Sequence, residues 1–273
     1  MAGLEDHAGD IVRKSRVGLG IAAEEVATLL GWSLSTLKTF EDEGVAPATE
    51  TWQRVCQQLD LDAEKLLAIL QGWEPSSVEL PWLTKIETDD GGMAVNAYLI
   101  KDPQSREAVL VDTGWSYPAL KRYLEANQAD VRQLFITHAH GDHIAALTEI
   151  REAIPEIEVL AASQALATNE PLKAGRTFSC GGLTIAVHET PGHAEDGLTF
   201  IVTENNGPRF QAALVGDALF AGSMGGAPRH FHLAKEKVRQ VILSLADETV
   251  IAPGHGPLTQ VGWEKQHLSL IHI

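Results

Sequence analysis

The residues whose types and spacing could do chemistry lie at positions 137–143, where the sequence reads T-H-A-H-G-D-H. The loop contains His138, His140, Asp142 and His143, and imidazole and carboxylate are ligand types that Zn²⁺, Mn²⁺ and Fe²⁺ share. A mostly apolar run at 131–136 precedes it and predicts a strand that delivers all four groups to one place. The spacing therefore predicts a metal-binding loop rather than a solvated turn with chance histidines.

Three later loops supply the same kinds of side chain, each after a run that reads as a strand. His193 follows a run ending at residue 187, Asp217 follows 212–215, and His255 follows 249–252. A glycine stands directly before each of them, as expected where the backbone comes close to a compact site. Together with the 137–143 loop the set contains five histidines and two aspartates. Two metal ions that share a bridging carboxylate require a set of this size.

Strands and helices alternate from about residue 80 onward, and they must position these loops. Strands are predicted at 94–100, 108–112, 131–136, 159–161, 183–187, 198–202, 212–215 and 249–252, and helices at 117–128, 143–153 and 238–245. Interleaving of this kind predicts a layered α/β domain.

The motifs resemble the metal set of the metallo-β-lactamase superfamily, and their order is most similar to its glyoxalase II-like hydrolases. The resemblance covers about residues 80–267 and includes the segments 111–114, 190–193, 216–220 and 253–256. It implies a four-layered αβ/βα sandwich with the metals at one edge between the sheets. It also implies thioester hydrolysis. Glyoxalase II proper binds glutathione through an additional C-terminal helical domain, and this sequence shows no counterpart of that domain.

The same resemblance divides the ligands between two divalent ions, with zinc as the expected metal and iron or manganese as alternatives. It gives His138, His140 and His193 to the first ion, Asp142, His143 and His255 to the second, and Asp217 to both as a bridge. Asp112 would orient a ligand without binding metal. The ions would hold a hydroxide that attacks a small thioester or ester, with Asp142 or Asp217 moving the proton. The implied enzyme is a metallo-hydrolase similar to hydroxyacylglutathione hydrolases.

Residues 1–72 have a different texture, with short helical patterns separated by Gly, Ser and Pro. We expect five helices, with Gly31 ending one, Ser33 or Ser35 capping the next and Asp62 capping the last. Residues 20–66 resemble the helix-turn-helix domain of Cro and repressor proteins. The resemblance implies that a recognition helix faces the DNA major groove with Ser33, Ser35, Thr36, Lys38 and Thr39.

The charge of this segment counts against DNA binding. Residues 1–75 carry six basic and thirteen acidic side chains, and only Arg13, Lys14, Arg16 and Lys38 could form a basic face. Since neutralisation of phosphates supplies most nucleic-acid affinity, DNA binding and a role in protein interaction or dimerisation both stay open.

The chain as a whole has 273 residues, 44% of them hydrophobic, and a formal net charge of −16. The charge argues against general affinity for nucleic acid or anionic membranes, and neither a membrane-spanning run nor a signal peptide is visible. The cysteines, Cys56 and Cys180, lie far apart and suit a reducing compartment. We therefore expect a cytoplasmic protein that binds a small-molecule substrate and no membrane, with homodimerisation as a further option.

The expected boundaries are a helix-turn-helix domain at 1–72, a linker at 73–79 and a metallo-β-lactamase-like domain at 80–267. Residues 268–273 read Leu-Ser-Leu-Ile-His-Ile, which one frame of a transposase sequencing adapter encodes. We expect this hexapeptide to be a non-native tail, and re-sequencing of the gene tests that expectation.

Two alternatives to hydrolysis stay open. A persulfide dioxygenase-like enzyme would hold a single iron on His138, His193 and Asp217. A DNA-binding regulator would use the metallo-β-lactamase-like domain as a sensor of a metabolite. A complete second ligand group favours two metals and hydrolysis.

Overall fold

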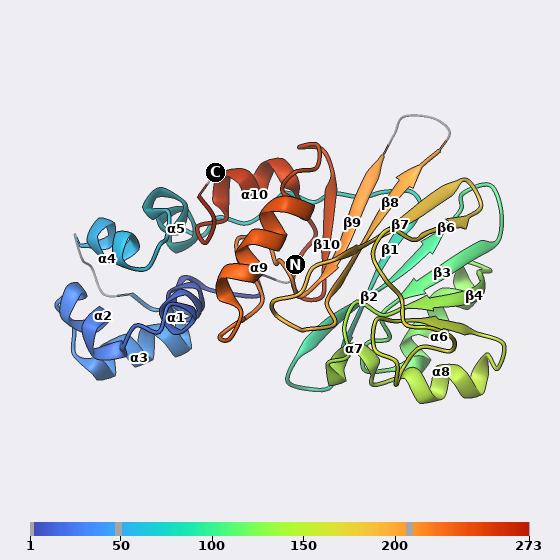
Figure 1. Cartoon of the computed structure of the whole chain (residues 1–273), viewed down its shortest axis with the longest axis horizontal. Coiled ribbons are helices and arrows are strands. Elements are labelled where there is room, and N and C mark those ends of the chain that lie inside the picture. Colours follow the sequence, from blue (N-terminus) through green and yellow to red (C-terminus); the bar gives the residue numbers. More distant parts are fainter. Residues whose placement is uncertain (1–2, 47–50, 206–209, 273) are drawn as a thin grey trace.

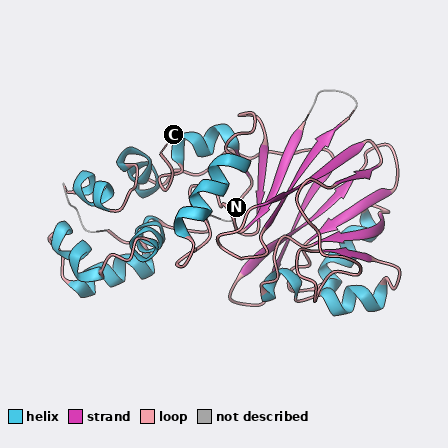
Figure 2. Cartoon of the chain, in the orientation of Figure 1, coloured by secondary structure: helices cyan, strands magenta, loops and turns pink. Residues whose placement is uncertain are grey.

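The computed structural model describes residues 3–46, 51–205 and 210–272, and two β-sheets packed face to face form the right half of the molecule in Figures 1 and 2. The first sheet contains, in spatial order, β1 (Leu83–Asp89), β2 (Ala94–Lys101), β3 (Glu107–Val111), β4 (Asp130–Phe135) and β5 (Glu158–Leu160). The second contains β11 (Thr259–Gln260), β10 (Val250–Pro253), β9 (Gln211–Gly216), β8 (Leu198–Glu204), β7 (Leu183–Glu189) and β6 (Thr177–Cys180).

Strands of both sheets contribute apolar side chains to a core between the sheets. Phe135 of the first sheet meets Phe200 of the second at 5.1 Å between ring centroids, and Val111 and Leu214 are buried in the same cluster. On the outer face of the first sheet, Leu120 of α6 (Tyr117–Ala126) and residues of α8 (Leu147–Ala153) cover a separate apolar cluster. Burial of apolar surface in these layers is the main stabilising contribution to the sandwich.

The outer face of the second sheet is covered by α9 (Phe231–Lys237), a π-helical turn at Val238–Ile242 and α10 (Val261–His267). The order of layers is therefore helix, sheet, sheet, helix (Figure 2). The prediction of a layered α/β domain is confirmed.

Among the described residues, five helices precede the sheets: α1 (Ala8–Gly18), α2 (Ala23–Leu30), α3 (Leu34–Glu43), α4 (Trp52–Gln58) and α5 (Ala63–Leu70). We call α1–α5 the helical unit. The predicted end signals are in place, since Gly31 ends α2 in the left-handed conformation, Ser33 caps α3 and Asp62 caps α5. The prediction that the N-terminus is helical is confirmed.

The helical unit does not have a core of its own. Val26, Leu37 and Phe40 of the unit belong to one continuous apolar cluster with Phe231 of α9 and Val261 of α10. Residues 268–271, which belong to the hexapeptide expected to be non-native, pack into the same region, and the Ser269 carbonyl accepts a hydrogen bond from the Asp62 amide at 2.8 Å. The helical unit is thus joined to the helix layer that covers the second sheet.

Candidate metal centre

The ligands predicted from the sequence stand at one edge of the two sheets. His138 and His140 follow β4, His193 follows β7, Asp217 follows β9 and His255 follows β10. Because β3 and β4 run parallel, as do β9 and β10, the carboxyl ends of each pair come to the same edge. Asp142 and His143 lie on the short helix α7 (Gly141–Ile144), directly after the first loop.

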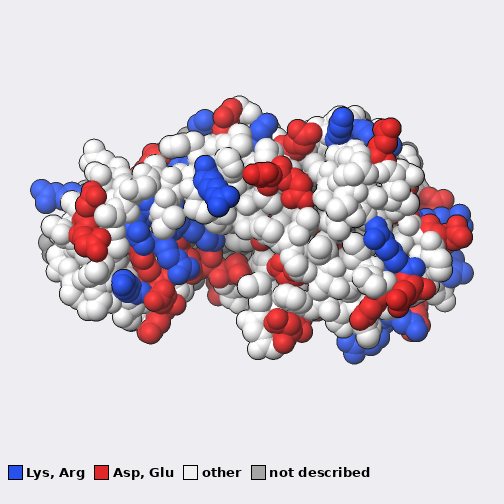
Figure 3. Space-filling view, turned by 60° about the horizontal axis from the view of Figure 1, so that its bottom comes forward, with Lys and Arg blue, Asp and Glu red and all other residues white. Residues whose placement is uncertain are grey.

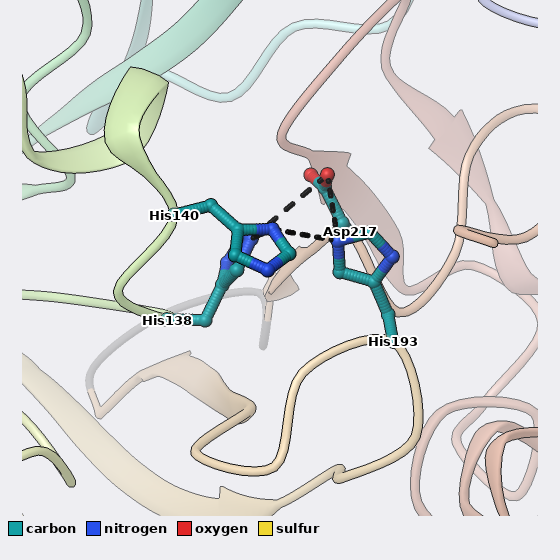
Figure 4. Close-up of side chains that lie close together, drawn as sticks. All are labelled: His138, His140, His193 and Asp217. Carbon is teal, nitrogen blue, oxygen red and sulfur yellow. Dashed lines mark hydrogen bonds and ion pairs between the residues drawn. The ribbon is translucent and has the colours of Figure 1, made fainter. Parts of the chain in front are cut away.

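The first group consists of His138, His140, His193 and Asp217, which point toward one another (Figure 4). Nδ1 of His140 lies 3.1 Å from Nε2 of His138 and 3.0 Å from Nε2 of His193. Oδ2 of Asp217 lies 3.4 Å from Nε2 of His193. One atom from each of the four residues can be chosen so that all lie within 4.8 Å of one another, which is compatible with a single ion between them.

The second group consists of Asp142, His143 and His255. Oδ2 of Asp142 lies 3.1 Å from Nε2 of His255 and 3.6 Å from Nε2 of His143. Asp217 stands between the groups, because its Oδ1 is 3.2 Å from Nε2 of His143 while its Oδ2 faces His193. The carboxylate of Asp217 can therefore reach an ion in either group.

The donor set fits divalent cations. In the described part of the chain, Nε2 of His143 and Oδ1 of Asp217 are buried and face each other at 3.2 Å, but neither makes a hydrogen bond, although burial of such atoms costs free energy. A metal ion would satisfy both atoms. The backbone at Gly254 comes so close to the donor groups that there is no room for a side chain. A Cβ at this position would lie 2.2 Å from Oδ1 of Asp217 and 2.6 Å from Cε1 of His143.

Buried carboxylate and hydroxyl groups orient the ligands. Asp112 lies 2.8 Å from Nδ1 of His143 and accepts hydrogen bonds from both the amide and the hydroxyl of Thr137, also at 2.8 Å. Asp112 therefore lies beside His143 and outside both donor groups. Its contact leaves Nε2 of His143 directed at the centre.

Three further supports were not predicted from the sequence. The carbonyl of Ala94 lies 2.6 Å from Nδ1 of His255, and the carbonyl of Gly226 lies 3.0 Å from Nδ1 of His193. Asp196 accepts a hydrogen bond from the amide of Ala139, between two ligands, at 3.1 Å. A carbonyl has no sequence signal, but Asp196 stands three residues after His193 and could have been suspected.

Electrostatic interactions hold two of the imidazoles in the cationic form when metal is absent. Burial lowers the pKa of His143, but Asp112 and Asp217 outweigh it and raise that pKa to about 10. Burial also opposes the cationic form of His255, and hydrogen bonds to Asp142 and Asp217 bring its pKa to about 11. Burial alone would raise the pKa of Asp217. The two cationic imidazoles outweigh burial and hold that pKa well below its usual range.

The other two shifted imidazoles are neutral. Burial, with the nearby charge of His143, lowers the pKa of His138 to about 2. Burial likewise lowers the pKa of His193. A neutral imidazole is the form that binds metal, so this side of the centre is ready to accept an ion.

The residues predicted to contact DNA lie on α3 and its cap, away from the metal centre (Figure 1). Ser33, Ser35, Lys38 and Thr39 are exposed, and Thr36 is partly exposed. The basic side chains that would accompany them are engaged within the chain, since Arg13, Lys14 and Arg16 pair with acidic partners. Figure 3 shows basic and acidic side chains interleaved over the helical unit.

None of the helices in the described residues combines the length and apolarity that a membrane span needs.

Comparison with known proteins agrees with the geometry of the centre. The profile of the metallo-beta-lactamase superfamily matches residues 90–255. A probable hydroxyacylglutathione hydrolase of Schizosaccharomyces pombe is 28% identical over 166 residues, which cover 58% of this chain and 62% of the relative. The chain thus spans less than two thirds of the length of that relative.

Two solved structures share the fold. The BLEG-1 B3 metallo-beta-lactamase is 26% identical, with a TM-score of 0.57 over 68% of this chain and 97% of its own. The ETHE1 protein of Myxococcus xanthus is also 26% identical, with a TM-score of 0.56 over 68% of this chain and 83% of its own. Since the profile matches more than half of the chain and includes all seven clustered residues, the chain belongs to the metallo-beta-lactamase superfamily.

Proposed function

We propose that the protein is a metal-dependent hydrolase of a small thioester or ester, similar to the hydroxyacylglutathione hydrolases. The observation that carries the proposal is the pair of donor groups that share Asp217, with buried atoms of Asp217 and His143 that face each other without a hydrogen bond. Two divalent ions would lower the pKa of a bound water molecule and polarise the substrate carbonyl. Zinc suits the histidine-rich set, and iron and manganese are alternatives.

The residues of the chain would bind the ions and transfer the proton. His138, His140 and His193 would hold one ion, Asp142, His143 and His255 the other, and Asp217 would join them. The carboxylate of Asp142 is the more exposed of the two aspartates, with 14% of its side chain accessible against 8% for Asp217. Asp142 is therefore better placed to accept a proton from the attacking water and return it to the leaving thiolate or alkoxide.

A panel of thioesters, lactones and phosphodiesters tests this proposal, with Asp142→Ala as the diagnostic variant. We expect thioester or ester hydrolysis in the natural protein and its loss in Asp142→Ala. Asp130→Ala, which changes an exposed carboxylate at the start of β4, is the control and should keep full activity. Hydrolysis that survives Asp142→Ala would contradict the two-metal mechanism.

One competing function is a persulfide dioxygenase-like enzyme with a single iron, which the first donor group alone would support. His138, His193 and Asp217 are close enough to hold it. The grouping of Asp142, His143 and His255 supports two metals instead. Metal analysis of purified protein separates the two functions. One iron per chain, together with oxygen uptake on glutathione persulfide, would support the dioxygenase. About two metal ions per chain would support the hydrolase.

The exposure of α3 favours a second activity in the same chain, binding of DNA through Ser33, Ser35, Thr36, Lys38 and Thr39. In this proposal α2 and α3 form the helix-turn-helix, with α3 as the recognition helix. The pairing of Arg13 and Arg16 with acidic side chains reduces the charge available for phosphates. A mobility-shift assay on the upstream region of the gene tests it, and the absence of salt-sensitive binding would remove it.

A further inference from the structure

The loop at 217–227, which follows β9, touches ligands of both donor groups. The amide of Gly225 donates to the carbonyl of Asp217 at 3.1 Å, and the carbonyl of Gly226 lies 3.0 Å from Nδ1 of His193. The ring of Phe220 meets the ring of His255 edge-on, with 5.7 Å between centroids. A displacement of this loop would therefore move three ligands together.

The same loop is held from its other side by the N-terminal end of the chain. Asp6 precedes α1 and accepts a hydrogen bond from the Ser223 hydroxyl at 2.5 Å. Lys14 of α1 forms an ion pair with Asp6, donates to the carbonyl of Met224 at 2.9 Å and lies 5.1 Å from the centroid of Phe220. One ammonium group thus contacts the loop at two points and its counterion at a third.

These contacts are shielded from solvent and span the chain. Ser223 is fully buried, and the side chains of Lys14 and Asp6 are only 17% and 9% exposed. The hydrogen bond from Lys14 to Met224 joins residues 210 positions apart. A buried charge that loses its partner is strongly destabilising, so the position of the loop depends on this pair.

We propose that Asp6 and Lys14 are positioning residues of the metal centre, which fix the 217–227 loop and through it His193, Asp217 and His255. The helical unit would then be part of the working enzyme and not a separable attachment. This inference rests on the proposed metal centre but on no particular substrate. It is a property of this chain, because the contacts come from residues that precede the segment matched by the superfamily profile.

The test compares Lys14→Met with Arg16→Met in the full chain. Arg16 also lies on α1 and also pairs with a buried acid, Glu41, at 2.8 Å, but that pair lies entirely within the helical unit. Side-chain exposure is matched, at 14% for Arg16 and 17% for Lys14. The measurements are zinc affinity by chelator competition, the absorption spectrum of the cobalt-substituted protein, and the thermal midpoint.

We expect both variants to lower the thermal midpoint, but only Lys14→Met to weaken zinc binding, by about 10- to 100-fold, and to change the cobalt spectrum. Lys14→Arg, which keeps a cation that can reach Asp6, should restore both properties. If Lys14→Met and Arg16→Met differ in neither zinc affinity nor cobalt spectrum, the pair has a purely structural role and the proposal is wrong.

Ser223→Ala keeps the test decisive if Lys14→Met does not fold. This variant removes the hydroxyl that binds Asp6 but leaves the ion pair intact, so the fold should persist with zinc affinity reduced in the same direction. Unchanged zinc affinity in Ser223→Ala would also overturn the proposal. A natural protein that binds zinc but hydrolyses nothing in the panel would remove the proposed hydrolase activity and leave this inference standing.

Discussion

Oδ2 of Asp112 lies 2.8 Å from Nδ1 of His143, and both side chains are buried. When His143 loses one of its two protons, the contact keeps the remaining proton on Nδ1 and leaves Nε2 to bind metal. Asp112 also adopts a left-handed backbone conformation, with φ of 58°, which is uncommon for a residue other than glycine. Strained backbone of this kind persists where the surrounding structure requires it.

The first prediction concerns Asp112→Asn. The substitution removes the negative charge that faces His143, so zinc affinity should fall by about 10- to 100-fold. Competition with a chromophoric chelator measures the change. Asp102→Asn, at a buried carboxylate of the turn after β2, is the control and should bind zinc normally. Equal affinities for the two variants would show that Asp112 does not orient the ligand.

The second prediction concerns the tight passage at Gly225. A Cβ at this position would lie 2.0 Å from the Asp217 carbonyl oxygen and 2.7 Å from Nδ1 of His193. Gly225→Ala should therefore displace both ligands and lower the metal content of purified protein, as measured by elemental analysis. Gly226→Ala offers a matched control, because nothing lies within 4 Å of a Cβ built there. Full metal content in both variants would contradict this prediction.

The cluster of histidines and aspartates could be predicted from the sequence because its signal is local. His138, His140, Asp142 and His143 lie within six consecutive positions, and each of the other three members of the cluster follows a short apolar run and a glycine. The alternation of strands and helices is also local, since side-chain periodicity and turn residues specify it. Each such feature can be recognised within a window of about ten residues.

Other features depend on contacts between residues that lie far apart in the sequence. The strand β1 was not predicted, because Thr84, Lys85 and Glu87 interrupt its apolar pattern and pairing with β2 decides its conformation. The helix predicted at 143–153 is two helices, α7 and α8, since the chain bends after the ligand loop. The contacts of Asp6 and Lys14 with residues 223–224 join opposite ends of the sequence.

The third prediction is that zinc binding releases protons. At pH 7 the metal-free protein carries a proton on each of His143 and His255, since carboxylates outweigh burial and raise their pKa values to about 10 and 11. Zinc must displace these protons, so its apparent affinity should rise with pH below about 10. His138 and His193, with lowered pKa values, are already neutral and release none.

Calorimetric titration of zinc in buffers of different ionisation enthalpy counts the protons. We expect about two from these four histidines at pH 7. A heat of binding that is independent of the buffer would mean that no proton is released, and would contradict the charge pairing of His143 and His255 with the aspartates.

The fourth prediction concerns Glu264 of α10, whose carboxylate is fully buried behind the 217–227 loop. It accepts hydrogen bonds from the amide of Gly222 at 3.0 Å and the hydroxyl of Thr259 at 2.7 Å. Burial nevertheless raises its pKa from 4.5 to about 8. The folded state therefore binds one more proton than the unfolded state between these two pH values, and this contribution to stability is complete below pH 4.5.

As the pH rises from 4.5 to 8, Glu264 should reduce the free energy of unfolding by about 1.4 kcal/mol per pH unit. Glu264→Gln cannot titrate and should remove this slope, so the difference between the natural protein and the variant isolates the contribution of one group. Urea denaturation at pH 5, 6, 7 and 8 measures it. Glu152→Gln, at an exposed position of α8, should keep the slope of the natural protein. Parallel pH profiles for the natural protein and Glu264→Gln would mean that the buried carboxyl group ionises at its ordinary pKa in the folded state.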